Sequence, residues 1–486
     1  MIAGTGSDVG KSIVATALCR IFLQDGYHPA PFKAQNMALN SYVTPDGLEI
    51  GRAQAVQAEA CKIPCSCAMN PLLLKPNSER SSQVVLLGKP IGNRDACEYF
   101  TSEGREHLRD KVNKAFKSLE NNFNPIVMEG AGSICELNLA DSDIVNMPMA
   151  RFANADVILI CDIDRGGVFA SAYGSIMLQK PEDQRRIKGI IVNKFRGDLR
   201  LFENGKKILE DICGVPVLGV VPYFNGIHIE EEDSVSLERK MNKAEEAKIN
   251  VAVIRLKHIS NFTDFDRLER DNRVCLYYTY EPEELKKADI IILPGTKSTI
   301  ADLIDIKNSG IAEVITSSYR NGKTVWGICG GYQMMGETIS DPKGIEGQKI
   351  IISGLGLLPT STILHDKKQT RQVITTFIPT GETVEGYEIH NGKTVVDSTA
   401  THVCASGSKS EGVWINERCL GTYLHGILDN DTVVDYLLSS TGKIDNTTID
   451  NEMTYSEYKD RQYDMLAEHV RKHLNIELLY KILSDD

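Results

Sequence analysis

The chain has 486 residues, of which 42% are hydrophobic and 25% charged, and this composition indicates a globular protein of two or three domains. Its formal net charge of −12 argues against general affinity for nucleic acid, and no apolar run approaches the ~20 residues of a membrane span. Twelve cysteines without paired spacing favour reduced thiols in the cytoplasm over a disulfide framework.

The N-terminal residues have the pattern of a phosphate loop. A short apolar start, Met1–Ala3, leads into Gly4-Thr-Gly-Ser-Asp-Val-Gly-Lys-Ser12, and a helical pattern follows. In such a loop backbone N–H groups wrap a phosphate, Lys11 neutralises the β and γ oxygens, and the Ser12 hydroxyl can bind Mg²⁺. The predicted ATP site consists of Gly4, Thr5, Gly10, Lys11 and Ser12. Because a strand usually has ~5–6 residues, we expect the native chain to begin upstream or the first strand to be clipped.

Several apolar segments of the first half end in polar residues. The predicted strands are 125–128, 155–161, 188–193 and 215–222, and helical patterns occupy 51–60 and 102–121. This alternation predicts a doubly wound parallel sheet, which binds ligands at the carboxyl ends of its strands. Glu129 follows the first of these strands, and a carboxylate opposite a phosphate loop is the usual partner of Mg²⁺. The alternative is a surface glutamate in a turn.

Three longer motifs make the first half recognisable: Lys33-Ala-Gln-Asn-Met-Ala-Leu-Asn-Ser41, Asp162-Ile-Asp-Arg-Gly-Gly-Val-Phe-Ala170 and Val192-Asn-Lys-Phe-Arg-Gly-Asp198. They resemble the cobyric acid synthase family, and the phosphate loop resembles that of the dethiobiotin-synthetase-like ATPases. The resemblance implies that ATP and Mg²⁺ activate the carboxylates of a corrinoid. It also implies that Glu129 holds the metal and that Asn193 recognises adenine. The substrate-side candidates are Lys33, Asn36, Asn40, Asp162, Asp164 and Arg165.

A charge-rich stretch without an apolar stripe is predicted to connect two domains. The predicted division is 1–229 for a phosphate-loop domain, 230–248 for the linker, 249–445 for a second α/β domain and 446–486 for a C-terminal helical extension. In the second domain, strand alternation opens at 249–255 and continues through 259–265. The C-terminal extension has amphipathic helical spacing, and we assign it a packing role.

The most informative stretch of the second half is Trp326-Gly-Ile-Cys-Gly-Gly-Tyr-Gln-Met-Met-Gly336, in which a single cysteine lies between glycines after an apolar run. The glycines permit a tight strand-to-helix turn with a strained backbone at Cys329. Such a turn places the sulfur at a helix N-terminus, where the helix dipole can activate it as a nucleophile. The alternative is a buried, inert cysteine beside a loop.

A nucleophile of this kind needs a base and an oxyanion site. His425 ends a strand-like run before a glycine, and it is the predicted base. His365 and His390 are the other histidines in comparable settings. Backbone N–H groups near Gly295 and Gly330 are candidates for the oxyanion site, with Gln333 as a further glutamine-binding candidate. After Gly295, the pair Lys297-Ser298 can hold a bound polar group.

The second half resembles the class I glutamine amidotransferases, which have a flavodoxin-like fold. The resemblance implies that Cys329 attacks the side-chain amide of glutamine while His425 transfers the proton. Most of that class has a glutamate two residues after the histidine, whereas this chain has Ile427, and the cobyrinic-type subgroup lacks the glutamate too. The group that orients His425 is therefore open, with Asp429 and Glu388 as candidates.

The two resemblances together imply an ATP- and glutamine-dependent ligase. It would amidate the b, d, e and g carboxylates of adenosylcobyrinic acid a,c-diamide through acyl phosphates, with ammonia released at Cys329. One alternative is synthesis of cobyrinic acid a,c-diamide, and another is a phosphate-loop ATPase with a non-catalytic amidotransferase-like binding domain. We expect no nucleic-acid or membrane partner, and the sequence leaves the oligomeric state open.

Overall fold

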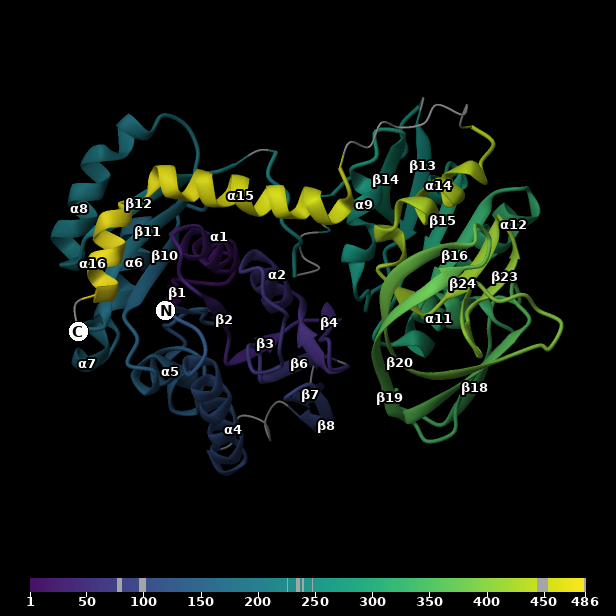
Figure 1. Ribbon diagram of the computed structural model, residues 1–486, viewed down its shortest axis with the longest axis horizontal. Coiled ribbons are helices and arrows are strands. Elements are labelled where there is room, and N and C mark those ends of the chain that lie inside the picture. The colour runs from purple at the N-terminus through teal and green to yellow at the C-terminus, as the bar shows by residue number, and fades with distance from the viewer. Residues whose placement is uncertain are drawn as a thin grey trace.

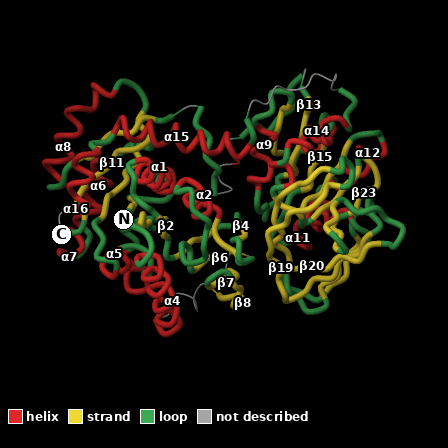
Figure 2. Tube along the Cα trace, viewed as in Figure 1, coloured by secondary structure: helices red, strands yellow, loops and turns green. Residues whose placement is uncertain are grey.

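The computed structural model describes residues 1–76, 81–95, 102–224, 226–232, 237, 240–246, 248–443 and 453–484. The described chain forms two lobes, which we call the first lobe (residues 1–232) and the second lobe (residues 248–443) (Figure 1). Both combine helices with strands (Figure 2). Among the described helices, none is long and apolar enough to cross a membrane.

The first lobe is organised around a parallel sheet with β1 (Ile2–Gly4) inside it. On one side of β1 lie β10 (Val157–Asp162), β11 (Ile187–Phe195) and β12 (Val217–Pro222), in that order and all parallel. On the other side, a parallel bridge from Ile2 to Glu129 places β9 (Ile126–Met128) beside β1, and β9 pairs with β2 (Ala30–Phe32). The predicted parallel sheet is confirmed. The phosphate loop follows β1, where the order of strands reverses and parallel sheets bind their ligands.

An inserted segment with mostly antiparallel strands separates β2 from β9. Its elements are β3 (Gln35–Met37), β4 (Ser41–Val43), β5 (Glu49–Gly51), α2 (Arg52–Ala60), β6 (Leu72–Pro76), β7 (Ser81–Leu86), β8 (Lys89–Asp95) and α4 (Ser102–Glu120). β6, β7 and β8 form an antiparallel meander, β3 runs parallel to β6, and β4 pairs with β5. β4 contacts strands of the second lobe, so the inserted segment forms part of the junction between the lobes.

The second lobe has a six-stranded sheet as its core. The order is β14 (Val274–Thr279), β13 (Ile249–Ile254), β15 (Ile290–Leu293), β16 (Thr324–Ile328), β24 (Cys419–Thr422) and β23 (Val413–Asn416). All neighbours are parallel except β23 and β24, and helices such as α11 (Thr299–Asn308) and α12 (Ile311–Arg320) connect them. The parallel strands are almost fully buried, as near-continuous apolar runs predict, whereas the antiparallel edge strand β23 is partly exposed.

A second sheet extends the second lobe toward the first. It contains β17 (Thr338–Asp341), β18 (Ile350–Ser353), β19 (Thr360–Phe377), β20 (Glu382–Val396) and β25 (Leu424–His425). β19 and β20 form a long antiparallel pair that reaches β4 of the first lobe (Figure 1). β25 pairs with β20, which fixes His425 at the end of this sheet.

The prediction that strand alternation continues through 259–265 is wrong. Asn261 has a φ of 53°, and Phe262–Phe265 form a 3-10 turn. Phe262 and Phe265 are buried in the core of the second lobe, so their alternation with polar residues reflects one turn of helix rather than a strand. The turn directs Asp264 inward, where it is also buried.

The C-terminal helices return to the first lobe. α15 (Tyr455–His473) begins with a capping box between Thr454 and Glu457 and runs from the second lobe back over the first, followed by α16 (Ile476–Ser484) (Figure 1). Leu466 and Val470 are buried against residues of α1 (Lys11–Gln24), and Leu474 bridges to Gly219 of β12. The core of the first lobe is therefore completed by residues from the far end of the chain.

Candidate active sites

The phosphate loop encloses the amino group of Lys11. Gly10 precedes α1 with a φ of 97°, and a Cβ atom there would lie 2.1 Å from Asn193 Nδ2, so only glycine fits. Lys11 Nζ donates to the carbonyl oxygens of Gly6 and Gly132 at 2.8 and 2.9 Å. Burial, partly offset by Glu129, lowers the pKa of Lys11 to about 8, so a bound anion would favour its charged form. The structure brings the predicted loop residues together: Gly4, Thr5, Gly10, Lys11 and Ser12.

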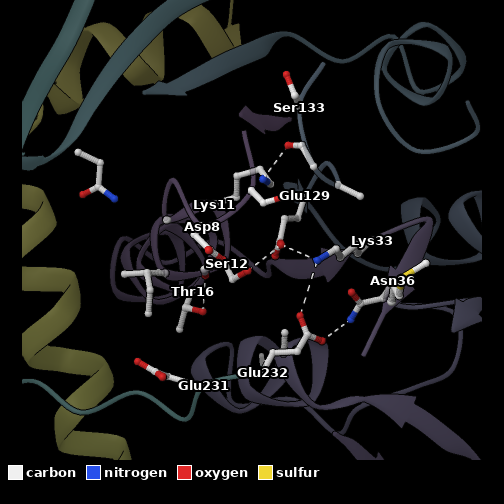
Figure 3. A pocket seen from close by; sticks show the side chains of 18 of the residues that line it. Asp8, Lys11, Ser12, Thr16, Lys33, Asn36, Glu129, Ser133, Glu231 and Glu232 are labelled. Carbon is white, nitrogen blue, oxygen red and sulfur yellow. Dashed lines mark hydrogen bonds and ion pairs between the residues drawn. The ribbon is translucent and has the colours of Figure 1, made fainter. Parts of the chain in front are cut away.

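Glu129 is the centre of a buried network beside the loop (Figure 3). Its Oε1 accepts hydrogen bonds from Ser12 Oγ and Lys33 Nζ, both at 2.8 Å, and its Oε2 accepts one from Gln57 Nε2 at 2.6 Å. Burial disfavours the charged carboxylate, but Lys33 and the hydrogen bonds lower the pKa of Glu129 below its ordinary value. Ser12 and Glu129 thus direct oxygen atoms to one point, and such ligands suit Mg²⁺.

The motif 33–41 leads from the phosphate loop to the second lobe. Lys33 and Asn36 line the cavity at the loop, and Asn36 Nδ2 donates to Glu232 (Figure 3). Further along, Asn40 Nδ2 donates to the backbone oxygens of Glu231 and Glu232 at 3.3 and 3.2 Å. Ser41 and Asn261 of the second lobe exchange two hydrogen bonds, from Ser41 N at 3.3 Å and from Asn261 Nδ2 at 3.1 Å.

The other substrate-side candidates lie apart from this motif. Asp162 accepts hydrogen bonds from its neighbour Asp164 N at 2.8 Å and from Lys194 Nζ at 3.0 Å. Asp164 pairs with Arg196 at 2.8 Å, and Arg165 reaches Asp8 of the phosphate loop at 3.4 Å. Among the described residues that line the loop cavity, Asp162, Asp164 and Arg165 are not included. Asp162 and Arg165 instead contact Lys194 and Asp8, which do line the cavity. Asn193 lines the cavity and donates to Val9 O at 2.9 Å.

The cavity at the phosphate loop is large and extends to the second lobe. Its volume is about 1410 Å³, more than a single drug-sized ligand requires. From the second lobe it is lined by Phe262, Asp266, Glu269, Arg270 and Asn272, and Tyr458 of α15 joins them. The space can therefore hold a nucleotide together with a second, bulky molecule.

Cys329 occupies the predicted strand-to-helix turn, between β16 and α13 (Gly330–Met335). Its φ of 52° and ψ of −106° are rare for a residue with a side chain. A Cβ atom at Gly331 would lie 2.0 Å from Leu293 O, so the turn needs glycine there. The Sγ atom faces Ile389 O at 3.5 Å inside a small cavity between the lobes.

His425 lies in the same cavity and is held by Asp264. His425 Nδ1 and Asp264 Oδ2 are 2.7 Å apart, and the other carboxylate oxygen accepts Gly426 N at 2.9 Å. Burial opposes protonation of the imidazole, yet Asp264 and Cys329 raise the pKa of His425 to about 10. The three side chains form a Cys–His–Asp arrangement in which the acid fixes the orientation of the imidazole.

The carboxylates suggested by the sequence do not occupy this position. Glu388 accepts hydrogen bonds from Arg371 and Gln369 and faces His390 at 3.5 Å. Asp429 lies in the turn after His425, where its backbone N donates to Gly426 O at 3.0 Å. The orienting acid was missed because Asp264 precedes His425 by 161 residues, a separation with no motif, and because its turn resembled a strand.

The other predicted residues surround Cys329. A Cβ atom at Gly295 would lie 3.0 Å from His425 Cε1, so Gly295 lies against the imidazole. Gly330 directly follows Cys329, and a Cβ atom there would lie 3.0 Å from Thr296 N. Gln333 lines the cavity, where its side chain donates to Tyr423 at 3.0 Å and accepts from Thr299 at 3.2 Å. The predicted oxyanion and glutamine residues therefore converge on one site.

A phosphate-loop lobe joined to a lobe with a buried cysteine–histidine pair, together with the chain's likeness to two family models and to curated relatives, defines the chain as a glutamine-dependent amidating ligase. Residues 1–236 match a family model described as the CobQ/CobB/MinD/ParA nucleotide binding domain. Residues 250–433 match the CobB/CobQ-like glutamine amidotransferase domain.

Curated relatives extend this likeness to the whole chain. Cobyric acid synthases from Phocaeicola vulgatus, Bacteroides fragilis and Parabacteroides distasonis are 61%, 59% and 52% identical to it. Each alignment covers 100% of this chain and 98% of the relative. The chain belongs to the cobyric acid synthase family.

Proposed function

We propose that this chain converts adenosylcobyrinic acid a,c-diamide to cobyric acid by amidating its b, d, e and g carboxylates. The observation that carries the proposal is the joining of the two sites by one largely buried segment, residues 33–41. Lys33 pairs with Glu129 at the phosphate loop, and Ser41 pairs with Asn261 beside the Cys329 cavity. The large cavity lined by both lobes provides space for a corrinoid beside a nucleotide.

At the second lobe, the Cys329 thiolate attacks the side-chain amide carbon of glutamine. His425 delivers a proton to the departing nitrogen, so ammonia leaves and a thioester remains, which water hydrolyses to glutamate. Asp264 holds the imidazole in the orientation that this transfer needs. N–H groups near Gly295 and Gly330 stabilise the negative oxygen of the tetrahedral intermediate.

At the first lobe, a substrate carboxylate attacks the γ-phosphate of ATP to give an acyl phosphate and ADP. Ammonia then displaces phosphate and forms the carboxamide. Lys11 neutralises phosphate charge, and Ser12 and Glu129 would hold Mg²⁺, which supplies further charge neutralisation when bound. We also propose the division into residues 1–229, 230–248, 249–445 and 446–486, with Asn193 as the adenine contact.

Product analysis tests the substrate assignment. The full chain is incubated with the a,c-diamide, ATP and glutamine labelled with ¹⁵N in the side-chain amide, and the products are analysed by mass spectrometry. We expect stepwise incorporation of four labels. Turnover of unamidated cobyrinic acid but not of its a,c-diamide would instead assign the chain to a,c-diamide synthesis. ATP hydrolysis without any amide formation would favour the non-catalytic binding domain.

A further inference from the structure

The Cys329 cavity contains more positive charge than the reaction described above uses. Lys75, Lys297 and Lys368 line it together with Cys329 and His425. Lys75 comes from β6 of the first lobe, whereas Lys297 and Lys368 belong to the second lobe. The cavity is therefore completed by a side chain from the opposite lobe.

One carboxylate accepts hydrogen bonds from two of these lysines. Glu49 of β5, whose side chain is fully buried, accepts from Lys75 Nζ at 2.8 Å and from Lys368 Nζ at 2.6 Å. Lys297 Nζ donates to the neutral Gln83 at 3.0 Å, and among the described residues it forms no ion pair with a carboxylate. Glu49 thus neutralises charge at Lys75 and Lys368 but forms no ion pair with Lys297 in the described structure, so a bound anion would stabilise the charged form of Lys297.

The neighbouring lysines affect the pKa of Lys297. Burial, together with the charges of Lys368 and Lys75, lowers the pKa of Lys297 to about 7. Glu346 lines the same cavity, and one of its oxygens accepts Ile300 N at 2.8 Å. Positive and negative groups therefore line one small space beside the thiol.

We propose that this lysine cluster binds the α-carboxylate of glutamine, with Lys297 in direct contact and Glu346 facing the α-ammonium group. The inference rests on the proposed release of ammonia from glutamine at Cys329. A free amino acid carries both charges on its α-carbon, whereas a glutamine residue within a peptide carries neither, so the site selects free glutamine. Lys75 and Lys368 are positioning residues that set the charge of the site through Glu49.

A substrate that lacks the α-carboxylate tests the contact. Ammonia release by the full-length enzyme is measured with glutamine and with glutamine capped as its α-N-methylamide, in which only the side-chain amide can yield ammonia. We expect wild-type kcat/KM to favour glutamine by about 10–100-fold, the effect of one charged hydrogen-bonding contact. Lys297→Gln should lose most of this preference by raising KM for glutamine, with little change for the capped substrate.

Two further variants separate binding from structure. Lys297→Arg keeps the charge and should retain the preference. Lys257→Gln removes an exposed lysine of the same lobe, paired with Asp305, and should behave as wild type. Equal losses for both substrates in Lys297→Gln, or an unchanged KM for glutamine, would overturn the subsite while leaving the proposed function intact. A wild-type enzyme that releases no ammonia from glutamine would contradict the proposed function itself.

Discussion

The two candidate sites differ in whether their side chains must change partners when a ligand binds. In the second lobe, the backbone fixes Cys329 at a strained turn, and Asp264 fixes His425 through a 2.7 Å contact. In the first lobe, Lys11 already donates to two carbonyl oxygens, and Glu129 is occupied by Ser12 and Lys33. The backbone and Asp264 therefore hold Cys329 and His425 in place without a ligand. The phosphate loop must exchange protein partners for phosphate oxygens when a nucleotide binds.

The largest expected effect comes from removing the nucleophile. Cys329→Ala should lower glutamine-dependent amidation by about 10⁴-fold or more, because the proposed thioester cannot form without the Cys329 sulfur. With ammonium salts in place of glutamine, the same variant should amidate at the wild-type rate. Both rates are measured by product mass spectrometry. Glutamine hydrolysis that survives the change would remove Cys329 from the mechanism, and total loss with ammonium would show that the sites are inseparable.

The second-largest effect is expected from removing the charge of Asp264, the acid that orients His425. Asp264→Asn is expected to reduce glutamine hydrolysis by roughly 10³-fold, since a neutral amide neither fixes the imidazole tautomer nor stabilises its charge. The raised pKa of His425, about 10, should fall toward the ordinary value, so the imidazole would lose its proton at a lower pH than in the wild type. An NMR titration of His425 and the pH dependence of the hydrolysis rate measure this change.

Asp429 offers a matched control for that variant. Burial raises the pKa of Asp429 to about 8, so this side chain is mostly neutral at pH 7 and an asparagine mimics it. Asp429→Asn should leave the pKa of His425 and the hydrolysis rate nearly unchanged. Equal effects of the two variants would mean that the acid next to the imidazole in the structure has no special role.

At the phosphate loop, Lys11→Ala should lower amidation by about 10²-fold with either glutamine or ammonium, because both routes need the activated carboxylate. Glutamine hydrolysis, assayed as glutamate release, should persist. An amidation rate that falls only with glutamine would place Lys11 in communication between the sites rather than in phosphoryl transfer.

The smallest effect on activity should follow a change in α15. Leu466→Ala removes a fully buried side chain and should lower the free energy of unfolding of the first lobe by about 2–4 kcal/mol. Glutamine hydrolysis at 25 °C should stay within twofold of wild type. Thermal denaturation with and without ATP identifies the affected lobe, because ligand binding raises only its transition. Glu468→Ala, on the exposed face of the same helix, should change stability by less than ~0.5 kcal/mol.

Those elements whose backbone is dictated locally were predictable from the sequence. The phosphate loop needs glycine at position 10, and the turn at Cys329 needs glycine after it, so both appear as short motifs. The parallel sheet of the first lobe follows from apolar runs with polar ends in the same way. Contacts between residues far apart in the sequence produce no such motif. Asp264 reaches His425 from a 3-10 turn whose periodicity imitates a strand, and Glu49 reaches Lys368 across 319 positions.

The return of α15 and α16 to the first lobe has a consequence for synthesis on the ribosome. Chains are made from the N-terminus at ~5–20 residues per second, and N-terminal domains generally fold first. Here the apolar face of α1 and β12 is covered by Leu466, Val470 and Leu474, which are translated after the whole second lobe. The nucleotide-binding lobe therefore completes its core last, although most of it is made first. A nascent chain whose nucleotide-binding lobe has a finished core therefore already carries the amidotransferase lobe.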